Sequence, residues 1–370
     1  MSEAVRRRRS NGDEEEQQRR RAARAAYRAT QGRDAGGRRA AAGGDVVDAG
    51  DARDAVDARR AAAAGATGAA GAATLRRSRR GAAEDGAAPR RASLRQRSFI
   101  GTLKALDVLS SAGAHVSVRV ADLDSGEGVL TGDDHLVLPV GGLGVVPLLI
   151  EVAAQIEFGQ LDPLEILDRG SIPPVGVAGI WQHLKAPALP VADLAVLAAA
   201  ASDAAAANVL LERVGLAAVR SRMDDIGLTK TALIDRFRDE RGLDDAPQVA
   251  LSTAGELSTL FAAIVNAQVV SPAVSAQVGE WLNLTQDLAL VGAATAMDPF
   301  AHEDDRHGLL FVNKTGRADG IRAEAGVLAG PAGGVAYALV VGFDDLSIAH
   351  RLRAHDAFRA LGTDLMEYVF

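Results

Sequence analysis

Two short motifs carry side chains that could perform chemistry. Ser202-Asp203 precedes an apolar, alanine-rich stretch, and Lys314-Thr315-Gly316 lies far downstream among strand-forming residues. Hydroxyl and ammonium groups of this kind act either as nucleophile and base or as donors to an anion. A purely structural interpretation also fits. In that case Ser202 would cap a helix, with the charge of Asp203 favoured by the helix dipole, and Lys314 would be the exposed end of a strand.

Other catalytic schemes find no support in the sequence. The chain has no Cys, which excludes disulfides, thiolate metal sites and cysteine nucleophiles, and no Ser lies in a Gly-x-Ser-x-Gly pattern. Residues 302–307 (His-Glu-Asp-Asp-Arg-His) hold two His at a spacing that does not align ligands on one helix face, which favours a solvated loop. The glycines of 141–144 lack the phosphate-binding patterns GxGxxG and GK[ST]. We therefore predict no metal and no cofactor.

Composition divides the chain near residue 95. Residues 1–95 hold 28 Ala, 22 Arg and 12 Gly with a single aromatic residue, Tyr27, so they cannot build an apolar core. Their net charge is +9 and that of the remaining residues is −16, which together give −7. Acidic residues at 13–16 and between 45 and 57 would repel phosphate groups. We predict a disordered tail, or translated sequence upstream of the true start, rather than a nucleic-acid-binding arm.

No segment has the character of a membrane span or of an export signal. The most apolar run, residues 136–156, is interrupted by two Pro, three Gly and Glu151, which indicates a buried helix. The run 61–75 is almost wholly Ala, Gly and Thr and lacks the hydrophobicity of a secretory signal. By default we predict a cytoplasmic protein, and no feature of the sequence predicts an oligomeric state.

Residues 97–370 alternate between helical and strand patterns and are long enough for one substantial core. The expected helices are 99–109, 142–158, helices within 191–215, 217–226, 252–266, 271–283 and 348–368. The expected strands are 116–120, 128–131, 309–314, 323–328 and 335–342. The inward face of the last helix is expected to carry Leu352, Phe358, Leu361, Leu365 and Met366.

The order of these elements predicts an α/β fold in which an antiparallel sheet is flanked by helices and joined to a helical lobe. We assign the sheet lobe to residues 97–135 and 305–370 and the helical lobe to residues 136–304. The disordered tail precedes both.

The two motifs and this order of elements resemble the class A β-lactamase and penicillin-recognising serine hydrolase superfamily over residues 103–368. Residues 202–215 (SDAAAANVLLERVG) are similar to the family's SDN helix with its closing glycine, and residues 314–322 (KTGRADGIR) to its KTG strand and the following turn. The order and spacing of the motifs are more specific than either motif alone. The resemblance implies an acylated serine with a lysine three residues after it. It also implies export, in contrast to the default location.

The residues that perform the family's reaction are missing. The chain has four Lys, at 104, 185, 230 and 314, and none follows a Ser by three positions. Aligning the apolar residues of 138–147 puts Gly141 at the nucleophile position and Gly144 at the lysine position. No Ser occurs between Ser125 and Ser171, so no shift of register supplies one. A glycine offers no oxygen to acylate.

Two supporting positions are altered as well. The resemblance assigns a deacylating glutamate to the loop 233–242. Counting forward from residue 235 puts Arg238 at the position of this glutamate, and counting back from residue 252 puts Phe237 there. Glu240 matches neither count, and we interpret it as a surface acid. Ala204 replaces the Asn of the SDN motif. Arg238 would add a cation to the groove, which favours anionic ligands.

A polar wall is what remains of such a site. With the family geometry retained, Lys314 would attract a carboxylate by charge while the hydroxyls of Thr315 and Ser202 donate to it. Gly316 and Arg317, which follow on the same strand, are also predicted to contact the ligand. The resemblance places the backbone N–H groups of residues 141 and 317 at the oxyanion-hole positions. We expect Gly141 to lie within reach of Lys314 and Ser202 at one end of the sheet, with the loop near residue 238 facing them.

Two functions of different classes follow. The first is a pseudoenzyme that binds a carboxylate-bearing ligand such as a β-lactam or a cell-wall peptide, or that serves as a protein-interaction scaffold. The second is an active hydrolase of β-lactams or esters, with Ser202 or a bound water as the nucleophile.

Overall fold

A computed structural model describes residues 99–370, with gaps at 177, 300–307 and 346. The tail predicted for residues 1–95 and the histidine-containing segment 302–307 lie outside the described residues.

A five-stranded antiparallel sheet with the strand order β2-β1-β10-β9-β8 forms one part of the fold. Strands β8, β9 and β10 follow one another as hairpins, and Gly320 supplies a φ of +66° in the first turn. β8 lies at the edge of the sheet, so one side of this strand is free for other segments to contact. The strands span His115–Asp122 (β1), Gly128–Gly132 (β2), Leu310–Ala318 (β8), Ile321–Gly330 (β9) and Gly333–Gly342 (β10).

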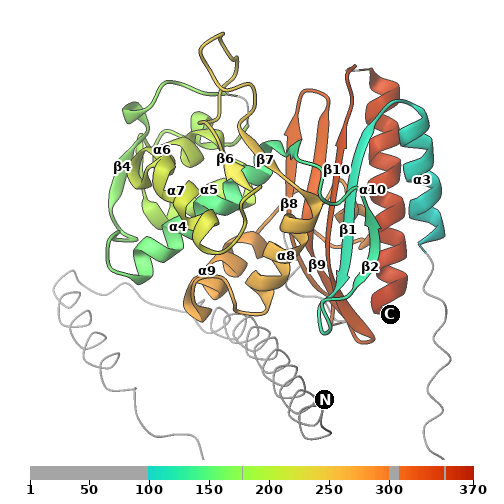
Figure 1. Cartoon of the computed structure of the whole chain (residues 1–370). Helices are drawn as coiled ribbons and strands as arrows, with labels where there is room; N and C mark the ends of the chain where they lie inside the picture. The colour runs from blue at the N-terminus through green and yellow to red at the C-terminus, as the bar shows by residue number, and fades with distance from the viewer. Residues whose placement is uncertain (1–98, 177, 300–307, 346) are drawn as a thin grey trace, which may run out of the picture. The chain divides into compact units, whose positions relative to one another are not determined.

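Side chains of the central strands alternate between two apolar cores. Phe311 and Leu328 belong to the core shared with α3 and α10, whereas their neighbours Val312 and Val327 belong to the core shared with the remaining helices. Because both faces of the sheet are covered, the central strand β10 is a nearly continuous apolar run. Figure 1 shows α3 and α10 on one face of the sheet. α3 spans Ile100–Ser111 and α10 spans Ile348–Val369. The helix α8, Ala254–Val265, packs on the other face of the sheet.

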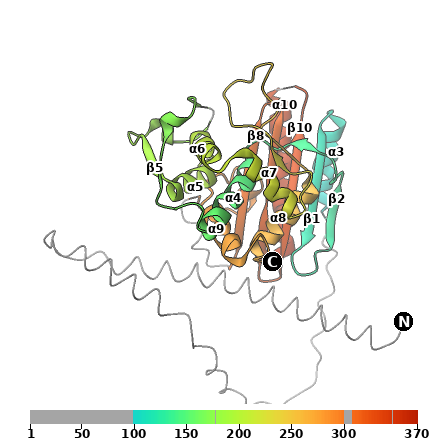
Figure 2. The same cartoon turned by 60° about the vertical axis from the view of Figure 1, so that its left-hand side comes forward.

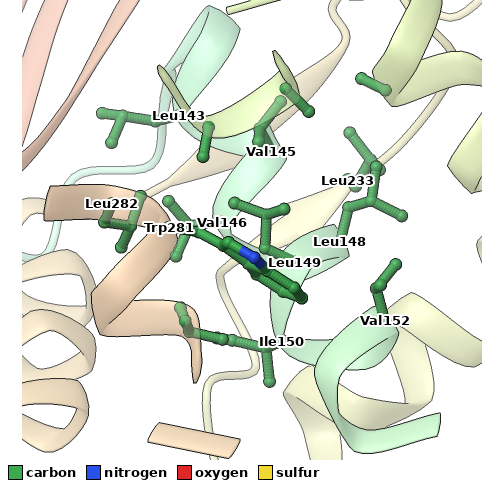
Figure 3. Close-up of a cluster of buried hydrophobic side chains, with 14 of the residues drawn as sticks. Leu143, Val145, Val146, Leu148, Leu149, Ile150, Val152, Leu233, Trp281 and Leu282 are labelled. Carbon is green, nitrogen blue, oxygen red and sulfur yellow. The ribbon is translucent and has the colours of Figure 1, made fainter. Parts of the chain in front are cut away.

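A helical lobe forms around α4, which contacts α5, α6, α7 and α9 (Figure 2). Nearly every residue of α4 is buried, because partners lie on all sides of it. Figure 3 shows Leu149 and Ile150 of this helix packed near Trp281. The helices span Val145–Glu157 (α4), Val191–Ala200 (α5), Ala204–Val214 (α6), Leu216–Asp225 (α7) and Pro272–Asn283 (α9).

Short strands and 3-10 turns lie between the longer elements. A three-stranded sheet of order β3-β7-β6 leads directly into a glycine-rich 3-10 turn, η2, and a second pair joins β4 to β5. The strands span Leu138–Pro139 (β3), Ile166–Asp168 (β4), Ala188–Pro190 (β5), Ala232–Leu233 (β6) and Ala250–Ser252 (β7). The 3-10 turns span Gly141–Gly144 (η2), Arg169–Ser171 (η3), Trp181–His183 (η4) and Val291–Ala294 (η5).

Side-chain caps fix several helix starts. Thr253 accepts a hydrogen bond from the backbone N of Glu256, and Ser271 caps α9 with Pro272 in its first turn. At α6 the cap is Asp203, whose Oδ1 accepts from the N of Ala206 at 2.9 Å. The interpretation of Ser202 as the capping residue is therefore wrong.

The predicted fold class, an antiparallel sheet flanked by helices with a helical lobe, is confirmed. Each predicted helix and strand has a counterpart, although the helix expected at 142–158 is divided into η2 and α4. Of the residues predicted on the inner face of α10, Phe358, Leu361 and Leu365 are fully buried, but Leu352 is 57% exposed and lies on the outer face. The exact lobe boundaries stay a prediction.

The buried core of α4 yields a stability prediction. We expect Leu149→Ala to lower the free energy of unfolding by ~2–5 kcal/mol, because Leu149 is fully buried and its neighbours can only partly close the cavity. Urea unfolding followed by circular dichroism measures this. Leu352→Ala is the matched control and should cost less than ~1 kcal/mol. Equal losses in the two variants would contradict this packing.

Candidate functional site

Ser202 lies in the tight connection between α5 and α6. Its φ of +50° is a conformation that residues with a side chain rarely adopt. The neighbouring carboxylate of Asp203 holds this connection in place, because its Oδ2 accepts hydrogen bonds from the backbone N of Ile180 and of Trp181, each at 2.7 Å. Asp203 therefore fixes Ser202 between the start of α6 and the segment around η4, and the side chain of Ser202 remains partly exposed.

Lys314 on β8 is fully buried, and its Nζ donates to the Oγ of Ser202 at 2.5 Å. The interpretation of Lys314 as an exposed strand end is therefore wrong. Burial lowers the pKa of Lys314 to about 8, the positive charge of Arg317 adds to this, and the carboxylates of Asp287 and Glu324 oppose it. The lysine and serine form one polar contact between the sheet and the helical lobe.

Thr315 and Arg317, the next polar residues on β8, both donate to a carboxylate of the chain itself. The Oγ1 of Thr315 donates to Oδ2 of Asp287 at 2.6 Å, and the Nη2 of Arg317 lies 3.0 Å from Oδ1 and 2.9 Å from Oδ2. These are charge-assisted donors of the kind that recognise a ligand carboxylate. Asp287 thus occupies the Thr315 and Arg317 part of the predicted polar wall.

A buried polar network holds the segment that carries Asp287. Asn313 donates its Nδ2 to the backbone O of Asp287 at 3.3 Å and to Oε1 of Glu324 at 2.7 Å, and the other oxygen of Glu324 accepts from the N of Val291 at 2.8 Å. The hydroxyl of Tyr337 also donates to Glu324. Burial raises the pKa of Glu324 to about 7, although these hydrogen bonds oppose the rise. The segment between α9 and β8 is therefore anchored at Asp287 and at Val291.

The glycine turn η2 packs directly against β8. A Cβ added to Gly141, whose φ is +54°, would lie 2.5 Å from the backbone O of Arg317, and one added to Gly142 would lie 3.2 Å from the O of Thr315. The contact is reciprocal, because a Cβ on Gly316 would lie 1.9 Å from the O of Val140. Backbones can approach this closely only where both sides lack side chains. The backbone of β8 fills the space into which a side chain at position 141 would project.

Gly144, the position assigned to the catalytic lysine, is equally enclosed. A Cβ there would lie 2.5 Å from the Cβ of Ala250 on β7 and 3.0 Å from Cδ1 of Leu233 on β6. Ala204, which stands for the Asn of the SDN motif, is also buried, at the start of α6.

In the loop 233–242, the backbone of Phe237 is fixed by hydrogen bonds and the charge of Arg238 is paired with carboxylates. Asn208 clamps the backbone of Phe237 by accepting from its N and donating to its O, each at 2.8 Å. Arg238 pairs with Asp235 and Asp245, each at 2.9 Å, so its charge is compensated within the loop rather than free in a groove. Burial acts to raise the pKa of Asp235, but hydrogen bonds from Arg238, Arg241 and the loop backbone hold it below the usual value.

The structure brings most of the expected site residues together and adds three that sequence reasoning missed. Ser202 touches Lys314, and the turn at Gly141 lies on the strand that carries Lys314, as expected. Asp287 and Asn313 had no signal, because neither lies in a motif or interrupts a pattern. Glu324 did have one, since it is the single charge within the strand expected at 323–328.

The described residues show neither a cluster of three or more His, Asp or Glu side chains placed to hold a metal ion nor a helix long and apolar enough to cross a membrane.

Restoring the nucleophile side chain should destabilise the protein. We expect Gly141→Ser to lower the free energy of unfolding by ~3 kcal/mol, because the new Cβ meets the backbone of Arg317 and φ is positive. Gly227→Ser is the control, since it also has a positive φ but nothing within 4 Å of its added Cβ, and it should cost only ~1 kcal/mol. Chemical unfolding of both variants measures the difference, and equal losses would show that position 141 is not crowded.

Burial of Lys314 predicts a pH-dependent stability. Its folded pKa of about 8 lies below the ordinary lysine value of 10.5, so folding opposes its charge and the cost is present in full below pH 8. Between pH 8 and 10.5 the native state releases the proton first, so the free energy of unfolding should rise by ~3 kcal/mol relative to a Lys314→Met variant. Parallel urea titrations across this range measure the difference, and a difference that does not change with pH would contradict the burial of Lys314.

Comparisons with known proteins bear on the fold and the family of this chain. A family model described as the β-lactamase enzyme family matches residues 102–369. Among solved structures, a β-lactamase from Sphaerobacter thermophilus aligns with a TM-score of 0.62 and 20% identity, covering 71% of this chain and 96% of that one.

Two further structures align with a TM-score of 0.58. One is a protein called PBP-A, at 20% identity over 72% of this chain and 96% of that one. The other is a β-lactamase from Xanthomonas campestris, at 19% identity over 72% and 98%. A comparison with curated proteins finds no match. Identities this low show the fold alone, but the family model extends over nearly all of the described residues, and the chain therefore belongs to the β-lactamase enzyme family.

Proposed function

We propose that the chain is a catalytically degenerate member of its family, a pseudoenzyme that recognises a carboxylate-bearing or peptidoglycan-like ligand or serves as a scaffold. One observation carries the proposal. The position assigned to the nucleophile is Gly141, and the backbone of Arg317 occupies the space where its side chain would be. Without an oxygen at this position, the acyl transfer implied by the family has no nucleophile.

The remaining catalytic positions support the same conclusion. Gly144 cannot supply an amine, and the packing around it leaves no room for one. Neither Phe237 nor Arg238 can act as the carboxylate base that a deacylating water needs. The loss of nucleophile and base together favours recognition over turnover.

A ligand that binds the wall must compete with Asp287. The carboxylate of Asp287 already accepts from Thr315 and Arg317, so this pair is suited to a carboxylate. A depression of about 370 Å³ borders Asp287 and is lined mainly by apolar residues such as Leu288 and Met297. A variant of the similar protein PBP-A was solved as an acyl-enzyme complex with penicillin G, which makes a penicillin the natural probe.

The Ser202 and Lys314 pair supports a second candidate, an active serine hydrolase. Their side chains form a hydrogen bond, and the lowered pKa of Lys314 means that a fraction of the amine is neutral near pH 7 and can accept a proton. Ser202 is partly exposed, so an acyl donor could reach it. In this case Ser202 would be the acylated residue.

Intact-protein mass spectrometry with a fluorescent penicillin separates the two candidates. We expect no adduct on the unmodified chain, because position 141 has no hydroxyl. A stoichiometric adduct that disappears in Ser202→Ala would overturn the pseudoenzyme, and release of hydrolysed penicillin in a parallel turnover assay would establish the hydrolase.

Melting temperatures with the same penicillin test recognition by the wall. We expect Asp287→Ala to bind about tenfold more tightly than the unmodified chain, since the internal competitor is removed. Asp107→Ala, an exposed change of the same charge on α3, is the control and should behave like the unmodified chain. An absence of any penicillin-induced shift in all three proteins would reject recognition and leave the scaffold role.

A further inference from the structure

Four basic side chains from three elements gather at the end of the sheet where β8 turns into β9. Arg317 and Arg322 are direct cross-strand partners in the β8–β9 register, so they lie on the same face of the sheet. By alternation along β9, this is the face of Leu328, which packs in the core shared with α10. Arg351 and His355 are one turn apart on α10 and therefore share one face of this helix.

The positive charges of these four side chains repel one another. Burial lowers the pKa of Arg322, and the positive charges of Arg317 and Arg351 lower it further. Burial also lowers the pKa of His355, and the charges of Arg322, Arg317 and Arg351 add to the effect. Like charges directly opposite each other on paired strands destabilise a sheet. The fold therefore maintains a local excess of positive charge at this point.

The carboxylates near the cluster do not balance it. Asp319, in the turn between β8 and β9, stabilises the charge of Arg322, and the negative charge of Asp287 acts to raise the pKa of His355. The carboxylate of Asp287 is already bound to Arg317 through both oxygens. Asp319 and Asp287 thus face three guanidinium groups, and Asp287 is already paired with one of them.

Several donors of the cluster have no protein acceptor. The Nη1 of Arg322 donates to the backbone O of Ala318 and of Ile321, but its Nε is buried without a partner. Within residues 99–370 as described, the guanidinium group of Arg351 makes no hydrogen bond or ion pair. Arg351 also lies in the first turn of α10, where the helix dipole is positive. The side chain of Arg317 is 51% exposed, so the cluster is open to solvent.

We propose that Arg317, Arg322, Arg351 and His355 form a binding site for a phosphate-class oxyanion, either free phosphate or a phosphate ester. Guanidinium groups bind phosphate oxygens through paired donors, and a dianion offers enough acceptors for the unpaired donors of Arg351 and for those of Arg317 that do not bond to Asp287. A bound dianion stabilises the protonated form of His355, so binding has a local signature. The site does not depend on the acyl chemistry of the proposed function, and it shares only Arg317 with the donors of the carboxylate wall.

Proton NMR of His355 in the full-length protein tests this site, with the signal assigned by its loss in a His355→Gln variant. Inorganic phosphate, compared with chloride at equal ionic strength, should raise the pKa of His355 in a saturable manner. Arg351→Gln should weaken phosphate binding about tenfold, because one charge-assisted contact is lost. Arg353→Gln is the matched control, since Arg353 is exposed on another face of α10. No saturable shift, or equal weakening in both variants, would overturn the proposal.

The source of the phosphate group is distinguished in the same assay. Glycerol phosphate represents a soluble phosphate ester, and vesicles of phosphatidylcholine with or without phosphatidic acid represent a lipid headgroup. A shift of His355 with glycerol phosphate identifies a soluble ester, and sedimentation with the phosphatidic acid vesicles that Arg351→Gln abolishes identifies a lipid. If neither ester binds while inorganic phosphate does, the site is for the free anion. If none of the three binds, there is no such site.

Discussion

The close contact between the glycine turn η2 and strand β8 is the constraint on which the rest of the site depends. Gly141 and Gly316 let two backbones approach to distances that no side chain at either position would allow. This contact joins the helical lobe to the edge of the sheet at the point where the family resemblance places the reacting serine. At this point the chain has a backbone contact instead of a nucleophilic side chain. Any side chain that carries a nucleophile would have to force η2 and β8 apart.

The polar groups around that contact are satisfied from within the chain. Lys314 bonds to Ser202, and Thr315 and Arg317 bond to Asp287. Buried polar groups need partners of this kind, because an unpaired group in an apolar interior is costly. Glu324 extends the network beneath β8 and anchors the segment that presents Asp287. The wall retains the donors of a carboxylate site, with a carboxylate of the protein already bound to part of it.

The fold could be predicted from the sequence because helical and strand periodicity are local properties. Capping residues such as Ser271 and the turn at Gly320 marked element boundaries, and the two motifs were enough to place Ser202 near Lys314. The role of Asp287 could not be predicted, since its contacts depend on how a loop without periodicity lies against an edge strand. The burial of Lys314 was missed for the same reason. A lysine near the end of a strand is usually exposed, and only the packed helical lobe covers this one.

A crystal structure of the unmodified chain grown with a saturating penicillin tests the central claim most directly. The account predicts that Gly141 stays packed on the backbone of Arg317 and that Ser202 carries no covalent acyl group. Any bound ligand would reach the Thr315 and Arg317 donors only by displacing Asp287. An open gap between η2 and β8 with an acyl group attached to the chain would contradict it.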